Sequence, residues 1–235
     1  MAVSPYQAAV LSDAPGAYWH LGEAAGIFPD LTGHGNNMNA TGTSPIRAQP
    51  GLVPGNSDGC IQANAGASGA GMGGTSPTTD LGDIWTVEAW IKRTETSTAV
   101  QTIMSKPNGG YNVRINNNRI ELLCAGTAVL ATSTVTVADT NVHHIVGTKS
   151  GASGHIYLDG VEVTGTYTNT TTANTAYWFA IGNDNGAAAV VNMFIDEVAI
   201  YPTALSLARV QAHYNTGLTP WSSGVPGARM MTGVG

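Results

Sequence analysis

The stretch Trp85-Thr-Val-Glu-Ala-Trp-Ile-Lys92 decides the fold class, because its side chains alternate with a period of two. Val87, Ala89 and Ile91 fall on one face, and the charged or aromatic residues between them fall on the other. Strict alternation of this kind is typical of a β-strand that turns one face toward a core. The sequence therefore predicts a strand here, with Glu88 and Trp90 on its opposite face.

Tight turns and further strands follow along the chain. Val113 and Ile115 alternate with polar residues before the turn Asn116-Asn117-Asn118, and Ile120, Leu122 and Cys124 alternate after it. Asp159-Gly160 likewise separates 154–158 from 161–167. Such turns favour β-hairpins, because Asn and Gly accept positive φ angles. Other strands are predicted at 17–21, near Cys60 and Ile61, and at 128–137, 142–148, 177–182 and 192–201. Many short strands joined by turns predict an all-β, antiparallel sandwich or barrel.

Helices are predicted only near the two ends of the chain. Ser4-Pro5 is typical of a helix start, and Asp13-Ala14-Pro15-Gly16 stops that helix. Ser206 caps a second helix that ends at Gly217. The Gly-rich segment 51–83 reads as a surface loop around one short strand. The expected organisation is a helical lead-in, one β domain and an extended tail, at residues 1–16, 17–217 and 218–235.

Composition narrows the classes of function. Hydrophobic residues make up 43% of the 235 positions, so the chain can bury a sizeable core. Charged residues make up only 10%, and the net charge of −6 argues against nucleic acid as a partner. The polar positions are filled by Thr, Asn, Ser and Gly, which suits sugar ligands, close packing in an assembly or a generic β-protein surface. No stretch predicts a membrane span, and the first sixteen residues do not read as a signal peptide.

Four segments carry a resemblance to a known family. They are Ala17–Glu23 with Asp30–Asn36, Trp85–Lys92, Val142–Thr148 with Ile156–Gly160, and Phe194–Tyr201 followed by the C-terminal helix. In this order and spacing, the chain resembles the laminin-G-like, concanavalin-A-like lectin/glucanase jelly-roll family over about residues 6–217. Val142 departs from the family, which often has Trp there. The resemblance implies an antiparallel two-sheet jelly-roll sandwich with short N-terminal and C-terminal helices.

A narrower resemblance concerns the two ends of that match. Tyr6–Pro15 and Ala212–Gly217 resemble virion proteins of tailed phages that carry this domain. This implies a phage virion protein, such as a capsid decoration, head or tail fibre or minor tail protein, assembled in the host cytoplasm. Its partners would be other virion subunits, in a homo-oligomer or lattice, with cell-surface glycans as a further ligand. The alternative is a glycan-binding adhesin or lectin module at a bacterial surface.

The sequence predicts no catalysis. A glycosidase needs two carboxylates flanking one bond. Asp196 and Glu197 are neighbours on a predicted strand and should point to opposite faces, and the Glu-x-Asp-x-x-Glu pattern of related hydrolases is absent. No nucleophile motif occurs either.

Asp196 is the most informative polar residue. Period-two alternation places it on one strand face with Phe194 and Val198, where a carboxylate is costly unless it is paired or bound to a metal. Asp30 lies in a loop with Asn36, where oxygen atoms suited to calcium could converge. The resemblance implies one structural calcium ion between this early loop and the late strand. The alternative is that Asp196 caps backbone N–H groups.

Three tryptophans are candidates for binding or docking. Trp90 and Trp178 could stack on a sugar, or the protein's own elements could cover them. Trp221 lies in the tail beyond the last helix and is a candidate docking anchor. Cys60 and Cys124 lack metal-type spacing, so two buried thiols are expected.

Overall fold

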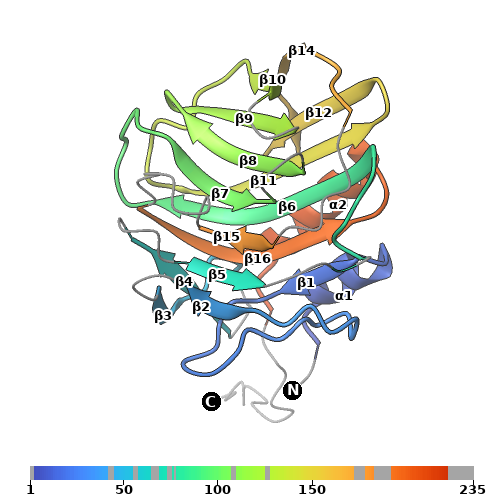
Figure 1. Ribbon diagram of the computed structural model, residues 1–235. Coiled ribbons are helices and arrows are strands. Elements are labelled where there is room, and N and C mark those ends of the chain that lie inside the picture. The colour runs from blue at the N-terminus through green and yellow to red at the C-terminus, as the bar shows by residue number, and fades with distance from the viewer. Residues whose placement is uncertain are drawn as a thin grey trace, which may run out of the picture.

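The protein is a sandwich of two antiparallel sheets that lie face to face (Figure 1). The computed structural model describes residues 3–41, 45–54, 58–64, 69–72, 76, 78–106, 110–124, 128–171, 178–182 and 192–221. Every strand pair within these ranges is antiparallel. The predicted fold class is therefore confirmed.

The first sheet has the order β13-β12-β11-β6-β16-β4-β3, and β1 also pairs with β16. Its strands are β1 (Ala17–Trp19), β3 (Ile46–Pro50), β4 (Gly59–Ala63), β6 (Ile84–Arg93), β11 (Val142–Ser150), β12 (Ser153–Leu158), β13 (Val161–Glu162) and β16 (Met193–Tyr201). The second sheet has the order β14-β10-β9-β8-β7-β15-β5-β2. Its strands are β2 (Asn39–Thr41), β5 (Gly69–Met72), β7 (Gln101–Ser105), β8 (Tyr111–Asn116), β9 (Arg119–Cys124), β10 (Ala128–Ser133), β14 (Thr164–Tyr167) and β15 (Phe179–Ile181).

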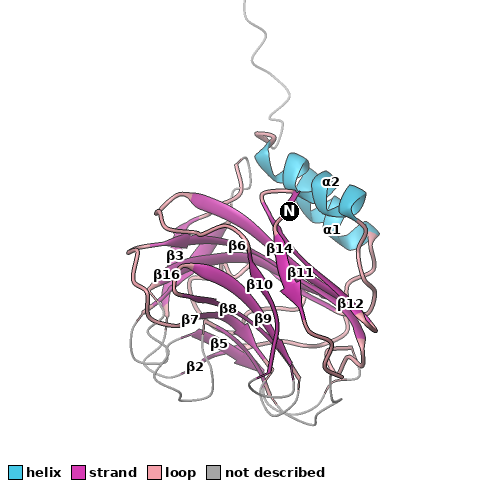
Figure 2. Cartoon of the chain, turned by 90° about the horizontal axis from the view of Figure 1, so that it is seen from above, coloured by secondary structure: helices cyan, strands magenta, loops and turns pink. Residues whose placement is uncertain are grey.

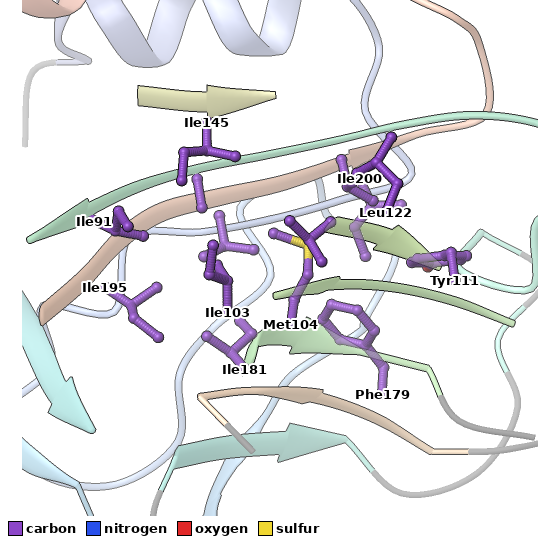
Figure 3. Close-up of a cluster of buried hydrophobic side chains, with 14 of the residues drawn as sticks. Ile91, Ile103, Met104, Tyr111, Leu122, Ile145, Phe179, Ile181, Ile195 and Ile200 are labelled. Carbon is purple, nitrogen blue, oxygen red and sulfur yellow. The ribbon is translucent and has the colours of Figure 1, made fainter. Parts of the chain in front are cut away.

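The hydrophobic core fills the space between the sheets. Val87, Ala89 and Ile91 of β6 all belong to it, so the alternation in the sequence reports the inner face correctly. Figure 3 shows how side chains of both sheets meet there, among them Ile91, Ile145, Ile195 and Ile200 from the first sheet and Ile103, Met104, Leu122, Phe179 and Ile181 from the second. Burial of this apolar surface is the main force that holds the sheets together.

The two predicted hairpin turns have the backbone that their residues favour. Asn117 and Asn118 take φ angles of 48° and 60° between β8 and β9. Asp159 and Gly160 take φ angles of 53° and 74° between β12 and β13. Positive φ at both central residues matches the twist of the flanking strands. The Asn-Asn and Asp-Gly residues at these turns therefore set the register of the two hairpins.

Four strands differ from the sequence expectation. β2, β3 and β7 were not predicted, and the Gly-rich segment expected as surface loop contains β5, which pairs with β15 and β2. All five residues of β7 are buried, so its sequence carries no alternation for a pattern search to detect. β2 and β5 are short, and neither alternates clearly in its sequence.

Two helices cover the outer face of the first sheet. Figure 2 shows α1 (Pro5–Ser12) and α2 (Leu207–Leu218) side by side on one flank of the sandwich. Ser4 and Ser206 cap them, accepting hydrogen bonds from Gln7 N and Arg209 N, as the sequence predicts. Neither helix is long and apolar enough to span a membrane, and the same holds for the rest of the described chain.

Candidate functional site

A β-bulge in β16 changes which way its acidic residues point. Asp196 pairs with Trp90 and Ala199 pairs with Glu88, so β16 advances three residues while β6 advances two. The extra residue is Glu197, whose φ angle is 51°. The expected shared face of Asp196 and Val198 is therefore wrong, because Val198 points into the core.

The same bulge corrects the expectation that Asp196 and Glu197 point to opposite faces. Asp196 stands opposite Trp90 on the outer face, and Glu197 accepts a hydrogen bond from the Tyr18 hydroxyl on that face. Both carboxylates are 0% exposed. A glycosidase pair has to contact its substrate. This buried pair has no such contact surface.

A cleft of ≈ 630 Å³ opens next to these acids. It lies beyond the end of β1, along β3 and at the start of β4, and its walls are His20, Gly22, Glu23, Ala48, Gln49, Pro50, Asp58 and Gly59. Ligand pockets are commonly about 300–1,000 Å³ in volume. The described part of the chain therefore offers a cleft of suitable size, with four polar side chains in its walls.

The cleft holds acceptor atoms that have no hydrogen bond within the described part of the chain. Both carboxylate oxygens of Asp58 and Oε2 of Glu23 are buried without a hydrogen bond. Asp58 Oδ2 nevertheless lies 2.7 Å from His20 Nδ1, which is close enough for an ion pair. Burial raises the pKa of Glu23, and the negative charge of Asp58 adds to the rise. Buried acceptors without a hydrogen bond lower the stability of the folded state, so a hydrogen-bond donor or a cation would bind favourably at this wall.

Glu197 and Asp196 lie behind this wall. Glu197 Oε2 is 3.9 Å from His20 Nε2, and that nitrogen is buried with no hydrogen-bond partner among the described residues. Ligand atoms of His20, Asp58 and Glu197 lie within 4.8 Å of one another. Burial raises the pKa of Asp196 well above its usual value, against the effect of the Leu52 N–H, and the Asp58 charge raises it further. Acidic side chains are thus gathered around a single imidazole, and burial disfavours the charged form of Asp196.

The three residues expected to hold calcium fall into two groups. Asn36 donates from Nδ2 to Asp30 Oδ2 over 2.9 Å, so these two residues do meet. Asp30 also accepts hydrogen bonds from Tyr18, Thr32 and the Asn36 backbone, and these donors lower its pKa against the effect of burial. Asp196 Oδ2 instead accepts from Leu52 N over 2.7 Å, as in the backbone-capping alternative. The calcium site stays a prediction.

The tryptophan candidates have different surroundings. Trp90 is 1% exposed, with Tyr214 stacked on it and Gly217 against its edge, so the protein's own elements cover it, as in the alternative to sugar stacking. Trp178 is half-buried beside residues 172–177, which lie outside the described part. Trp221 is half-buried in a small hollow with Ser4 and Pro5. The start of the tail thus lies against the N-terminal lead-in, while the tail beyond it, 222–235, lies outside the described residues.

A second acid on the outer face is fully supplied with donors. Glu88 is 0% exposed beneath α1 and α2. Its Oε1 lies 2.5 Å from the Tyr6 hydroxyl and 3.2 Å from His144 Nε2, and its Oε2 lies 2.9 Å from both the Tyr201 hydroxyl and His213 Nδ1. We call these five residues the Glu88 cluster. They tie both helices and three strands to one carboxylate, which is a structural role.

Glu88 and His213 hold each other in the charged form. Burial alone would raise the pKa of Glu88, but His213 and His144 hold it well below its usual value. Burial opposes protonation of His213, yet the Glu88 carboxylate raises its pKa. His213 Nε2 also lies 2.9 Å from Asp13 at the end of α1. Helix α2 is therefore linked electrostatically to both the sheet and α1.

Comparison with known proteins agrees with this architecture. The chain belongs to the concanavalin A-like lectin/glucanases superfamily, whose laminin-G family model matches residues 68–211, more than half of the chain. A comparison with curated protein sequences found no match. The sequence resemblance to this family is thereby confirmed, whereas the narrower resemblance to phage virion proteins gains no support.

Solved structures share the fold at low sequence identity. The binding domain of botulinum neurotoxin serotype D/C has a TM-score of 0.67 and 13% identity, over 88% of this chain and 53% of its own. The receptor binding domain of botulinum neurotoxin type G has a TM-score of 0.63 and 16% identity, over 86% of this chain and 51% of its own. A Trypanosoma rangeli sialidase has a TM-score of 0.63 and 13% identity, over 84% of this chain and 32% of its own. The chain thus spans about a third to a half of these proteins, and the likeness shows the fold alone.

The sequence did not reveal the residues of the cleft. Asp58 is far from His20 and Glu23 in the chain, and no motif joins the three residues. His20 stands in the cleft wall, but nothing in the sequence marks it as a site residue. The one available signal was local: polar His20 precedes Leu21, which is buried, and polar Glu23 follows two residues after it. That pattern indicates a strand end where polar side chains emerge together.

Proposed function

We propose that this chain is a non-catalytic binding module that recognises a carbohydrate in the cleft lined by His20, Glu23, Gln49 and Asp58. The observation that carries the proposal is the pair of buried acceptors Asp58 Oδ1 and Glu23 Oε2, which have no hydrogen bond in the described part of the chain, beside Asp58 Oδ2, whose contact is an ion pair with His20. Sugar hydroxyls are donors, and a hydrogen bond to a carboxylate is stronger than one between neutral groups. Gln49 adds an amide that can both donate and accept.

The surroundings of the cleft support this proposal. The chain belongs to a lectin/glucanase superfamily, and two structural neighbours bear the names of binding domains. The fully buried Asp196–Glu197 pair supports binding without hydrolysis, since a substrate cannot reach it.

A glycan array tests the proposal with two variants. The double substitution Glu23→Gln and Asp58→Asn keeps the shape of the cleft but removes its charge, so binding to the recognised glycan should fall at least tenfold. Glu162→Gln is the matched control, because Glu162 is an exposed acid on β13, at the opposite edge of the first sheet from β3. Full binding by the double variant, or no glycan bound by the wild type, would refute the proposal.

A second candidate is a structural protein of a tailed-phage virion, as the narrower resemblance implies. The observation that favours it is the position of the two ends. Helices α1 and α2 lie side by side, Arg209 pairs with Asp13 over 2.8 Å, and Trp221 packs beside Ser4. A single attachment point could therefore hold both ends of the chain on a particle or, in the alternative, on a bacterial surface.

Deletion of residues 219–235 tests this second candidate. The segment carries only one charge, Arg229, together with several apolar residues that a partner could cover. We expect the shortened protein to keep a folded sandwich but to lose incorporation into virions. Full occupancy in purified particles would remove the tail as the anchor.

A further inference from the structure

We infer that the cleft selects sugars that carry a free, protonated amino group, with Glu23 and Asp58 as the residues that determine this specificity. The inference rests on the proposed function, because it names the class of glycan that the cleft would bind. An N-acetylated sugar should bind more weakly than the same sugar with a free amine, and acidic sugars should be rejected.

The backbone brings the two acids onto one wall of the cleft. Gly22 lies directly against the start of β4, since a Cβ atom there would lie 2.8 Å from Gly59 N and 3.2 Å from Cβ of Asp58. Glu23 follows Gly22 and Asp58 precedes Gly59, so both acidic side chains begin at this contact. Burial raises the pKa of Glu23, and the nearby charge of Asp58 raises it further. A cationic group bound beside both carboxylates would relieve this repulsion.

The hydrogen-bonding capacity of this wall matches an ammonium group. Glu23 Oε2 and Asp58 Oδ1 have no hydrogen bond among the described residues, and Asp58 Oδ2 lies 2.7 Å from His20 Nδ1. An ammonium group has three donors and no acceptor, whereas an acetylated amine keeps one N–H and adds a carbonyl oxygen. Hydrogen bonds between charged partners are also stronger than those between neutral groups. A free amine therefore suits two carboxylate acceptors better than its acetylated form.

Both acids can turn their oxygen atoms toward a ligand. The side chain of Asp58 is 22% exposed, and Glu23 is half-buried in the cleft wall. The last torsion angle of an Asp or Glu side chain has a broad minimum, so a small rotation of the carboxylate costs little. The enclosed oxygens can therefore reach a ligand in the cleft without movement of the backbone.

The cationic side chains near the cleft do not favour an acidic sugar. No lysine or arginine stands in the cleft wall within the described residues. Arg47, which lies close by, donates to the backbone oxygens of Glu23 and Gly26 over 3.2 and 2.9 Å, and its guanidinium group lies 4.0 Å from the centre of the Phe28 ring. A sugar carboxylate would face two carboxylates here, and like charges that face each other suppress binding. The net charge of −6 favours the approach of a cation.

A glycan array of matched pairs tests the inference on the full chain. Each pair holds an N-acetylated glycan and the same glycan after removal of its acetyl groups, and sialylated glycans are included as acidic probes. The pH is about 6, where an amine with a pKa of about 7.7–8.0 is protonated. Calorimetry then measures the affinity of the chain for both members of the best pair. We expect the free amine to bind at least about tenfold more tightly, and high salt to weaken this binding.

Two double variants with equal changes in charge assign the preference to the cleft. Glu23→Gln with Asp58→Asn should abolish the preference for the free amine. Asp139→Asn with Glu162→Gln is the matched control and should keep it. The side chains of Asp139 and Glu162 are 46% and 43% exposed, and β11 and β13, where they lie, are separated from β4 by β6 and β16. A melting curve checks that each variant is folded.

The outcomes separate this inference from the proposed function. Equal binding of both members of every pair, or tighter binding of an acetylated or sialylated glycan, overturns the inference. The proposed function survives that result if the cleft variant still loses the bound glycan. A preference for the free amine that persists in the cleft variant also overturns the inference. If no glycan binds to the wild type, the proposed function fails, and the inference fails with it.

Discussion

Two buried acid sites lie on the outer face of the same sheet, and they differ in how their oxygens are supplied. In the Glu88 cluster, both carboxylate oxygens have two partners each, within 2.5–3.2 Å. At the cleft, both oxygens of Asp58 and one of Glu23 lack a hydrogen bond within the described residues, although Asp58 forms an ion pair with His20. One oxygen of Asp196, behind the cleft wall, also lacks a hydrogen bond there. The first site is sealed by two helices, whereas the second opens to solvent.

This difference indicates two roles: Glu88 stabilises the fold through its four partners, whereas the proposed role of the acids at the cleft is to bind a ligand. A buried carboxylate with four partners stabilises the elements that supply them, because each partner is anchored elsewhere in the structure. A buried carboxylate without partners lowers the stability of the folded state until something binds. Acid-to-amide substitutions at the two sites should therefore change stability in opposite directions.

Glu88→Gln should give the largest effect. It removes the charge that His213 faces and turns an acceptor into a donor among four donors. We expect the free energy of unfolding to fall by about 3–5 kcal/mol, as when one partner of a buried ion pair is removed. Urea denaturation measures the change, with Glu162→Gln as an exposed control that should stay within about 1 kcal/mol. A loss below about 1 kcal/mol in Glu88→Gln would contradict the stabilising role of the Glu88 cluster.

Gly217→Ala should loosen the helical cover of the Glu88 cluster. A Cβ atom at residue 217 would lie 2.3 Å from Cζ2 of Trp90, so α2 has to shift outward. We expect a loss of about 1–3 kcal/mol, which is typical of overpacking, although Ala is the better helix former. Asn215→Ala, at an exposed position of the same helix, is the control and should be neutral or stabilising. Equal stability of the two variants would show that the cover is not tightly packed.

The pH dependence of stability should reflect the Glu88–His213 pair. The pKa of Glu88 is lowered, so its contribution is present above its usual value of 4.5 and is lost as the pH falls through its folded pKa. The pKa of His213 is raised, so its contribution is present below its usual value of 6.5 and is lost as the pH rises through its folded pKa. We expect stability to fall by on the order of 1 kcal/mol on the alkaline side.

Denaturation at several pH values between 5 and 9 measures this slope. His213→Gln should lower stability at pH 6 and flatten the alkaline slope, whereas His155→Gln, at an exposed ion pair, should keep the slope of the wild type. An unchanged slope in His213→Gln would assign the pH dependence to another group.

Asp196→Asn should give the smallest effect, and its sign sharpens the comparison. The pKa of Asp196 is raised, so ionisation of this acid destabilises the fold as the pH rises above its usual value of 3.8. Asn is neutral and can still accept the Leu52 N–H. In buffer with chelator at pH 7, we expect a gain of about 1 kcal/mol in stability, since a buried unsatisfied charge is removed. A loss as large as that of Glu88→Gln would mean that Asp196 already has the partners it needs.

The sequence predicted the parts of the fold that local chemistry determines. The alternation in 85–92, the positive-φ turns at Asn117 and Asp159, and the Ser206 cap all depend on neighbouring residues, and the structure confirms them. β7 escaped prediction because it is buried on both faces. Its position depends on the second sheet and the core, which no short window of sequence contains.

The site was harder to predict, because it depends on contacts between distant segments. His20 and Asp58 meet through the pairing of β1 and β4 with β16, not through a motif. The bulge at Glu197 reverses the alternation within β16, so the period-two argument was correct up to Asp196 and wrong after it. Trp90 looked available in the sequence because the helix that covers it lies more than a hundred residues further along the chain.

The bulge at Glu197 also has a consequence for how this site is inherited. It is one residue long, so a single inserted or deleted codon creates or removes it. A relative without that codon would keep Asp196 on the outer face and would have no second acid beside it. In an alignment of relatives, the difference would appear as a one-residue gap directly after Asp196. The acidic floor of the cleft can therefore be gained or lost in one mutational step, while the apolar residues on both sides of it keep their places in the core.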